Sequence, residues 1–142
     1  MKQKVEHDWF KAEQLHFAAM AGDAEKCVCL IAEGYDPNGF DQIGNTPLHY
    51  AAKEEHFDAA MALLLHGARV NALDESKIGD TALAHIAQTC SLKMARLLLD
   101  AGADPTLHIG LSRSAIERAK DRIRGEGPRV YELFCKVAGR QP

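Results

Sequence analysis

The stretch DQIGNTPLHYAAKEEHFDAAMALLLHGARVNALD, residues 41–74, decides the fold of this chain. Within it, Thr46 followed by Pro47 is typical of a helix start, because the threonine can cap the helix and the missing N–H of proline costs nothing in the first turn. Leucines and alanines at helical spacing predict one short helix over residues 47–53 and a second over residues 57–65. The expected unit is therefore a pair of short helices joined by a turn.

Similar segments stand on either side of this one. EQLHFAAMAG begins at Glu13 and TALAHIAQTC at Thr81, and both align with TPLHYAAKEE. The anchoring leucines of the three copies are 33 and 35 residues apart: Leu15, Leu48 and Leu83. Nineteen residues after each leucine comes a glycine, where a left-handed residue can end the second helix: Gly34, Gly67 and Gly102. Two markers that recur together in three copies indicate a repeat protein.

The period, the TPLH motif and the GA-x-VN-A hairpin resemble the ankyrin repeat. The tetratricopeptide repeat has a similar period but neither motif, so it is set aside. The resemblance implies an all-α solenoid of stacked helix-turn-helix pairs joined by β-hairpin fingers, with about four repeats and degenerate capping ends. The expected parts of this single domain are an N-terminal extension at residues 1–10, repeats at 11–40, 41–73 and 74–108, and a capping repeat at 109–142.

The outer copies depart from the pattern. Two residues are inserted within residues 74–79, which predicts a longer finger between the second and third repeats. A fourth copy places SAIE, from Ser114, where TPLH would stand. Its last helix is expected to run to about Ala138 with an inward apolar face: Val130, Leu133, Phe134 and Val137. Before the first copy, Trp9 and Phe10 are expected to shield the open side of the stack.

Composition agrees with a soluble globular protein of 142 residues, because 46% of the residues are hydrophobic and 26% are charged. The N-terminal residues lack an apolar core of signal-peptide length, so a cytoplasmic protein is expected. The cysteines are expected to be reduced: Cys27, Cys29, Cys90 and Cys135. Residues 1–110 hold 9 Lys/Arg and 16 Asp/Glu, a net charge of −7, and this acidic body favours a partner with a basic surface.

No residue pattern predicts an enzyme, and no cofactor or metal is implied. Nucleophile elbows, P-loops, dinucleotide fingerprints and zinc spacings are absent from the sequence. Glu54 and Glu55 beside His56 could act as an acid–base group, but a solvated charge cluster in a turn is the ordinary outcome. The resemblance implies that His49, and His16 at the matching position, hydrogen-bond the loops between repeats.

The expected function is protein–protein interaction, as an inhibitor, an immunity-type antidote, an adaptor or a chaperone, by a monomer. In ankyrin proteins the finger tips and the exposed face of each first helix grip the partner, and Met20 and Ala21 hold matching positions on the first helix. The remaining candidate binding residues follow by position: Phe40, Gln42, Ile43, Asn45, Tyr50, Lys53, Glu54, Leu73, Lys77, Ile78, Asp80, His85, Gln88, Ile109, Leu111 and Arg113.

Six of the finger residues are large and apolar and would form a row along one edge, as interaction sites often do: Phe40, Ile43, Leu73, Ile78, Ile109 and Leu111. The alternative function is nucleic-acid binding through the basic C-terminal repeat, where residues 111–142 carry a net charge of +4. Its candidate residues are Arg113, Arg118, Lys120, Arg122, Arg124 and Arg129. Capping the stack is the favoured use of these cations, so no nucleic acid and no membrane are expected as partners.

Overall fold

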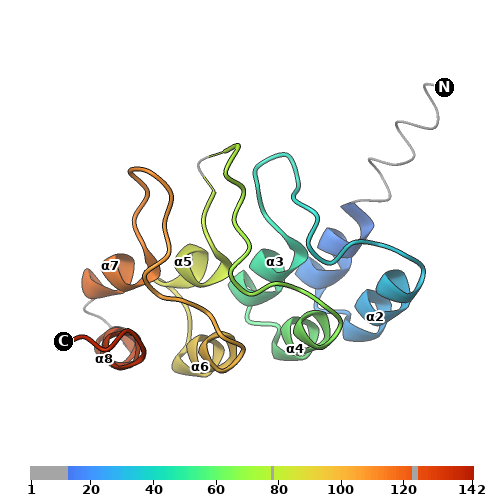
Figure 1. The fold of residues 1–142 in the computed structure, drawn as a ribbon. Helices are drawn as coiled ribbons and strands as arrows, with labels where there is room; N and C mark the ends of the chain where they lie inside the picture. Colours follow the sequence, from blue (N-terminus) through green and yellow to red (C-terminus); the bar gives the residue numbers. More distant parts are fainter. Residues whose placement is uncertain (1–12, 78, 123–124) are drawn as a thin grey trace.

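The computed structural model describes residues 13–77, 79–122 and 125–142, and Trp9, Phe10, Ile78 and Arg124 lie outside these ranges. The chain forms two rows of helices that run side by side from one end of the molecule to the other (Figure 1). Three long connections rise from the helices on the same side. This is the all-helical solenoid with fingers that the resemblance implies.

Each repeat contributes one helix to each row. In the first row, a helical segment over residues 13–21 is followed by α3 (Pro47–Lys53), α5 (Ala82–Ile86) and α7 (Ala115–Lys120). In the second row stand α2 (Ala24–Ala32), α4 (Phe57–Leu65), α6 (Leu92–Asp100) and α8 (Gly127–Val137). The bounds of α3 and α4 confirm the two helices predicted from the sequence.

Polar side chains start the first-row helices by accepting hydrogen bonds from free backbone N–H groups. Thr81 accepts from the N–H of Ala84 at 3.1 Å, and Ser114 forms a capping box with Glu117. At α3 the side chain of the third helical residue binds back to the cap: Nδ1 of His49 accepts from the N–H of Thr46 at 3.1 Å. Each cap removes an unsatisfied donor from a buried helix end.

Small side chains allow the second-row helices to stack. Cys27, Ala60 and Ala95 hold equivalent positions on α2, α4 and α6, and all three are fully buried. The anchoring leucines of the first row lie in the same core: Leu15, Leu48 and Leu83. Burial also raises the pKa of the Cys27 thiol to about 11, so Cys27 is a packing residue and not a reactive one. All four cysteines lie within the described residues and are free thiols.

Asparagines tie the bases of the first and second fingers to the next repeat. The side chain of Asn38 donates to the carbonyl of Gly67 at 2.9 Å and accepts from the N–H of Arg69 at 2.7 Å. Asn71, one repeat later, makes the same pair of bonds to Gly102 and Asp104. Because these bonds join backbone groups of successive repeats, they hold the stack at a constant spacing.

The fingers are hairpin-shaped loops, and no strand occurs within the described ranges (Figure 1). The second finger, which carries the two-residue insertion, turns tightly at its end. A Cβ atom added at Gly79 would lie 2.9 Å from the carbonyl oxygen of Asp74, so only glycine allows this turn without a shift of the backbone.

The capping repeat differs from the expectation at one position. Val130 and Phe134 of α8 are buried as expected and Leu133 is half-buried, but Val137 is half exposed and Cys135 is buried instead. Val137 is the last residue of α8, so the last turn of the helix leaves its side chain largely uncovered. None of the helices in the described part of the chain has the length and apolar character of a membrane span.

Candidate functional site

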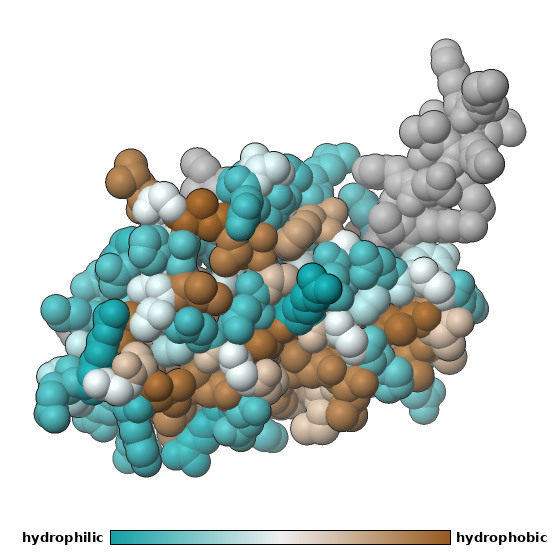
Figure 2. Space-filling view, in the orientation of Figure 1, coloured by the Kyte–Doolittle hydropathy of each residue, from teal (hydrophilic) through white to brown (hydrophobic). Residues whose placement is uncertain are grey.

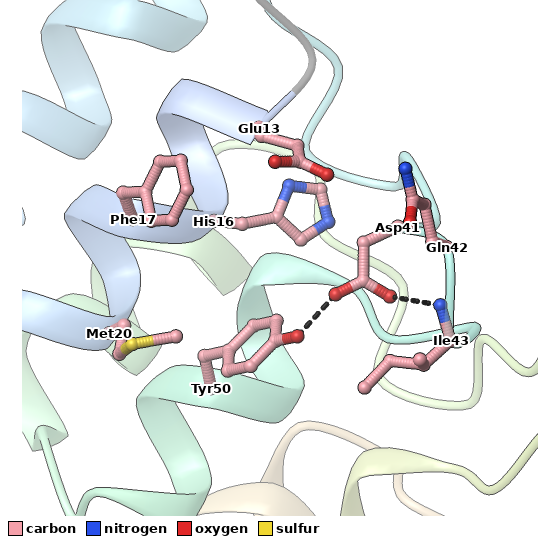
Figure 3. A pocket seen from close by; sticks show the side chains of 8 residues that line it. All are labelled: Glu13, His16, Phe17, Met20, Asp41, Gln42, Ile43 and Tyr50. Atoms are coloured by element: carbon pink, nitrogen blue, oxygen red, sulfur yellow. Dashed lines mark hydrogen bonds between the residues drawn. The ribbon is translucent and has the colours of Figure 1, made fainter. Parts of the chain in front are cut away.

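A hollow of about 220 Å³ opens at the N-terminal end of the molecule, between the helical segment 13–21, α3 and the first finger. Side chains from all three elements point toward it (Figure 3). They are Glu13, His16, Phe17, Met20, Asp41, Gln42, Ile43 and Tyr50. The helices supply one wall and the finger supplies the other.

His16 fastens the finger to the helix behind it. Its ring is buried, and Nε2 lies 2.9 Å from the carbonyl oxygen of Gly39 and 3.0 Å from that of Asn45. Because both partners are carbonyls, Nε2 carries the hydrogen. The ring of Tyr50 meets the His16 ring edge to face, with centroids 6.0 Å apart. The back of the hollow is therefore a fixed surface.

Asp41 organises the turn of the finger. One carboxylate oxygen accepts hydrogen bonds from the N–H groups of Ile43 at 3.1 Å and Asn45 at 2.9 Å, and the other accepts from the Tyr50 hydroxyl. Burial alone would raise the pKa of Asp41, but these hydrogen bonds outweigh it and hold the pKa below its usual value. Burial and the bond to Asp41 raise the pKa of Tyr50. Near neutral pH the hollow thus contains a carboxylate beside a neutral phenol.

The rim of the hollow is apolar and open to solvent. The exposed fractions are 52% for Phe17, 41% for Met20 and 68% for Ile43. Phe40, on the same finger, is 41% exposed. Large apolar side chains gathered around a depression are typical of an interaction site.

The structure brings together only some of the residues predicted from the sequence. Gln42, Ile43 and Tyr50 line the hollow with Met20. Asn45 does not lie at a finger tip, because it is buried at the base of the finger, where its carbonyl accepts from His16. Lys53, Glu54 and Gln88 are exposed on the first-row helices or just beyond them, outside the hollow.

The second and third fingers are less apolar at their surface than the sequence predicts. Leu73 and Ile109 are half-buried, and Ile78 lies outside the described residues. Leu111 is fully exposed, and Figure 2 shows hydrophobic surface at the tip of the third finger. Lys77 donates to the carbonyl of Asp41 at 3.1 Å, so the second finger leans on the first.

Several charged residues that the sequence suggests as binding residues already have partners within the protein. Asp80 pairs with Arg118 at 2.7 Å, and His85 is half-buried with its ring edge-on to His49. Arg113 pairs with Asp121, and Arg122 donates to the carbonyl of Cys90 at 2.6 Å. Of the arginines considered for nucleic-acid binding, Arg118 and Arg122 therefore hold the capping repeat on the third repeat, and Arg113 is paired within the capping repeat.

At the turn after α3, the side chains of Glu55 and His56 bind different partners. The carboxylate of Glu55 accepts from the N–H and hydroxyl of Ser91 at 2.8 and 2.7 Å, whereas Nε2 of His56 lies 3.1 Å from the carbonyl of Met20. Each side chain contacts a different neighbouring repeat. Among the described residues, no three His, Cys, Asp or Glu side chains gather as metal ligands would.

Sequence reasoning missed Glu13 and Phe17 as members of the site. Both lie on the helical segment 13–21, at positions i and i+4, and so share one face with His16 and Met20. An exposed phenylalanine beside the motif histidine was the signal that could have identified them.

Comparison with known proteins agrees with this architecture. A family model for ankyrin repeats in three copies matches residues 15–109. Inversin from Danio rerio is 41% identical over 64% of this chain and 9% of its own length. Two Arabidopsis thaliana proteins, the putative E3 ubiquitin-protein ligases XBAT34 and XBAT35, are 33% and 34% identical over 91% and 81% of this chain.

These relatives are much longer proteins, since the chain spans about a third or less of their length, 35% of the first ligase and 25% of the second. Ankyrin repeats are non-catalytic modules that generally mediate protein–protein interaction. Three matched repeats, histidines that bind the neighbouring loops and fingers on a common side all lead to one conclusion: the chain belongs to the ankyrin-repeat family.

Proposed function

We propose that this protein binds a partner protein at the hollow between the first finger and the first-row helices, and acts by occupying the partner's surface. An inhibitor, an immunity-type antidote, an adaptor and a chaperone all work in this way. The observation that carries the proposal is the exposed apolar rim of Phe17, Met20 and Ile43 around a fixed polar base. We expect a cytoplasmic monomer that needs no cofactor.

The size of the hollow indicates what enters it. Pockets for small molecules of drug size usually have volumes of about 300–1,000 Å³. At about 220 Å³ and open to solvent, this hollow suits one inserted side chain of a protein partner. An apolar anchor would contact Phe17 and Met20 on the helix and Ile43 on the finger.

The charge around the hollow favours a partner that carries a basic side chain next to its apolar anchor. Glu13 and Asp41 place two carboxylates at its edge, and the first 110 residues carry a net charge of −7. An arginine or lysine next to the apolar anchor would meet both the local carboxylates and the field of the acidic body. We therefore expect the partner to present an apolar side chain flanked by basic ones.

Capture from a lysate of the source organism tests this proposal. The double variant Met20→Ser, Ile43→Ser removes apolar rim without touching the buried core, because both side chains are exposed. We expect it to lose at least about tenfold in affinity for the captured partner in titration calorimetry.

Val137→Ser is the matched control, since Val137 is an exposed apolar residue of α8 in the capping repeat. It should bind as the unaltered protein does. If the folded double variant holds the same partner with unchanged affinity, the hollow is not the binding site. Equal weakening by Val137→Ser would show that the effect is not specific to the hollow.

The nucleic-acid alternative has less support. Arg118 and Arg122, which lie in and just after α7, donate to groups of the third repeat. Breaking those bonds to reach a phosphate would cost stability.

A further inference from the structure

We propose that a second surface, the groove between α4 and α6, docks a short amphipathic helix from an acidic protein partner. We call it the outer groove. It has a volume of about 630 Å³. Met61, Leu64 and Leu65 form one wall, and the other wall carries Lys93, Arg96, Leu97 and Asp100. It belongs to the second row of helices, on the side away from the fingers (Figure 1).

The groove exists because the second-row helices are not evenly packed. α4 packs closely on α2 and much less closely on α6. At one end, the ammonium group of Lys93 lies 4.2 Å from the centre of the Phe57 ring, in a cation–π contact that bridges the two helices. A channel between the helices remains open beyond that contact.

Apolar side chains line the channel, and two of them are largely uncovered by the other described residues. Met61 is 51% exposed and Leu65 is 76% exposed, and Leu64 lies beside them at the spacing of one helical face. Leu97 faces them from α6. Figure 2 shows hydrophobic surface gathered over the part of the molecule where Figure 1 places α4. A continuous apolar strip of this kind is typical of a docking site.

The dimensions of the groove suit one helix and not a second globular protein. The helical part of the apolar wall is the last turn of α4, from Met61 to Leu65, about 6 Å long, and Ala68 extends it into the loop that follows. A stable interface between two folded chains needs roughly 20–30 residues from each side. An amphipathic helix that lays its apolar face into a groove needs far fewer, because three or four anchors at i, i+3, i+4 and i+7 make the contact.

The charge at the groove determines the kind of helix. Lys93 and Arg96 stand at i and i+3 on the same wall, and neither is among the ion pairs of the described residues. Asp100 also lines this wall, so the groove carries two cations and one carboxylate. Residues 1–110 as a whole hold 9 Lys/Arg and 16 Asp/Glu, so a groove with an excess of cations is an exception in an acidic body. A helix with carboxylates next to its apolar face would pair with both cations.

This inference does not rest on the proposed function, because the outer groove and the hollow share no residue. The probe for its test is a synthetic fluorescein-labelled peptide of about 14 residues, with leucines at i, i+3, i+4 and i+7 and glutamates elsewhere. A second peptide carries lysines in place of the glutamates. We expect the acidic peptide to bind with a dissociation constant below about 100 µM in fluorescence anisotropy, and the basic peptide at least about tenfold more weakly.

Variants locate the binding. Leu65→Ser and Arg96→Glu should each weaken the acidic peptide by at least about fivefold, and Ile43→Ser, in the hollow, should leave it unchanged. Circular dichroism checks that each variant folds, and amide shifts in NMR spectra should change along α4 and α6. The proposal is overturned if the acidic peptide fails to bind, if the basic peptide binds as well, or if folded Leu65→Ser binds normally. Loss of peptide binding in Ile43→Ser would place the peptide in the hollow and also overturn it.

Discussion

His49 joins its own helix to the neighbouring repeat through both nitrogens of one buried ring. The N–H and hydroxyl of Thr46 donate to Nδ1 at 3.1 and 2.8 Å, and Nε2 donates to the carbonyl of Asp80 at 2.6 Å. This pattern requires the neutral ring, since a protonated ring has no acceptor for the Thr46 groups. Burial, the largest cause, lowers the pKa of His49 to about 4.

The lowered pKa predicts that the protein loses stability in mild acid. Below the ordinary histidine pKa of 6.5 the unfolded chain binds a proton at this residue, and the folded chain does not until about pH 4. The free energy of unfolding should therefore fall between pH 6.5 and pH 4, by an amount on the order of 3 kcal/mol from His49. Above pH 6.5 His49 is neutral in both the folded and the unfolded chain, so its full contribution to stability is present at neutral pH.

Urea unfolding at several pH values, with the variant His49→Gln beside the unaltered protein, measures this contribution. The variant should be less stable at pH 7 and its stability should depend less on pH, so the two curves converge toward pH 4.5. Part of the dependence should remain in the variant, because burial also lowers the pKa of His85. Parallel curves across the window would contradict the assignment.

At the scale of one element, the start of α6 depends on a residue of the preceding repeat. Ser91 caps α6 by accepting from the N–H of Met94 at 3.1 Å, and Glu55 in turn binds the N–H and hydroxyl of Ser91. Glu55 also adopts the left-handed conformation, with φ of 58°, which is unfavourable for any residue with a Cβ atom. The bonds to Ser91 offset this backbone cost.

Two substitutions at Glu55 separate the side-chain bonds from the backbone cost. Glu55→Ala keeps the unfavourable φ and loses both bonds, so it should lower the free energy of unfolding by about 1–2 kcal/mol. Glu55→Gly loses the same bonds but relieves the backbone, and should be about 0.5–1 kcal/mol more stable than the alanine variant. Chemical denaturation gives both values. Glu54→Ala, at the exposed neighbouring position, is the control and should change stability by less than about 0.5 kcal/mol. Alanine and glycine variants of equal stability would rule out backbone cost at this residue.

The elements differ in how far the sequence could predict them. The ends of α3 and α4 were predicted because local chemistry determines them: Thr46 and Pro47 start one helix, and Gly67, with φ of 100°, follows the other. The partners of Glu55 and the burial of Asn45 were not predicted. Both depend on contacts between residues that are 29 to 36 positions apart in the sequence. The same limit applies to the binding surfaces. Tyr50 and Ile43 were found by position in the motif, whereas the hollow and the outer groove arise only when the repeats stack.

At the scale of the whole molecule, the contact between the third and fourth repeats differs from the others. The third repeat has Ala84 where the motif has histidine, so it cannot reach the next finger as His16 and His49 do. Arg118 of α7 makes the connection from the opposite side, to the carbonyl of Ala84 at 3.2 Å and to the carboxylate of Asp80 at 2.7 Å. At the position of the motif histidine, the capping repeat therefore uses the guanidinium of Arg118, and Arg122 adds a second bond to the third repeat at Cys90.

In a solenoid, stability is a sum of repeat terms and nearest-neighbour terms, so a weakened contact loosens the repeat beyond it first. Arg118→Met keeps the apolar stem and removes the bonds to Asp80 and Ala84. We expect amide exchange to accelerate in α7 and α8 while α3 and α4 keep their protection, and the urea transition to broaden. Arg129→Met, at an exposed position of α8, is the control and should exchange as the unaltered protein does. Hydrogen exchange followed by mass spectrometry resolves the repeats. Uniform acceleration along the whole chain would show instead that the four repeats unfold as one unit, whichever contact is weakened.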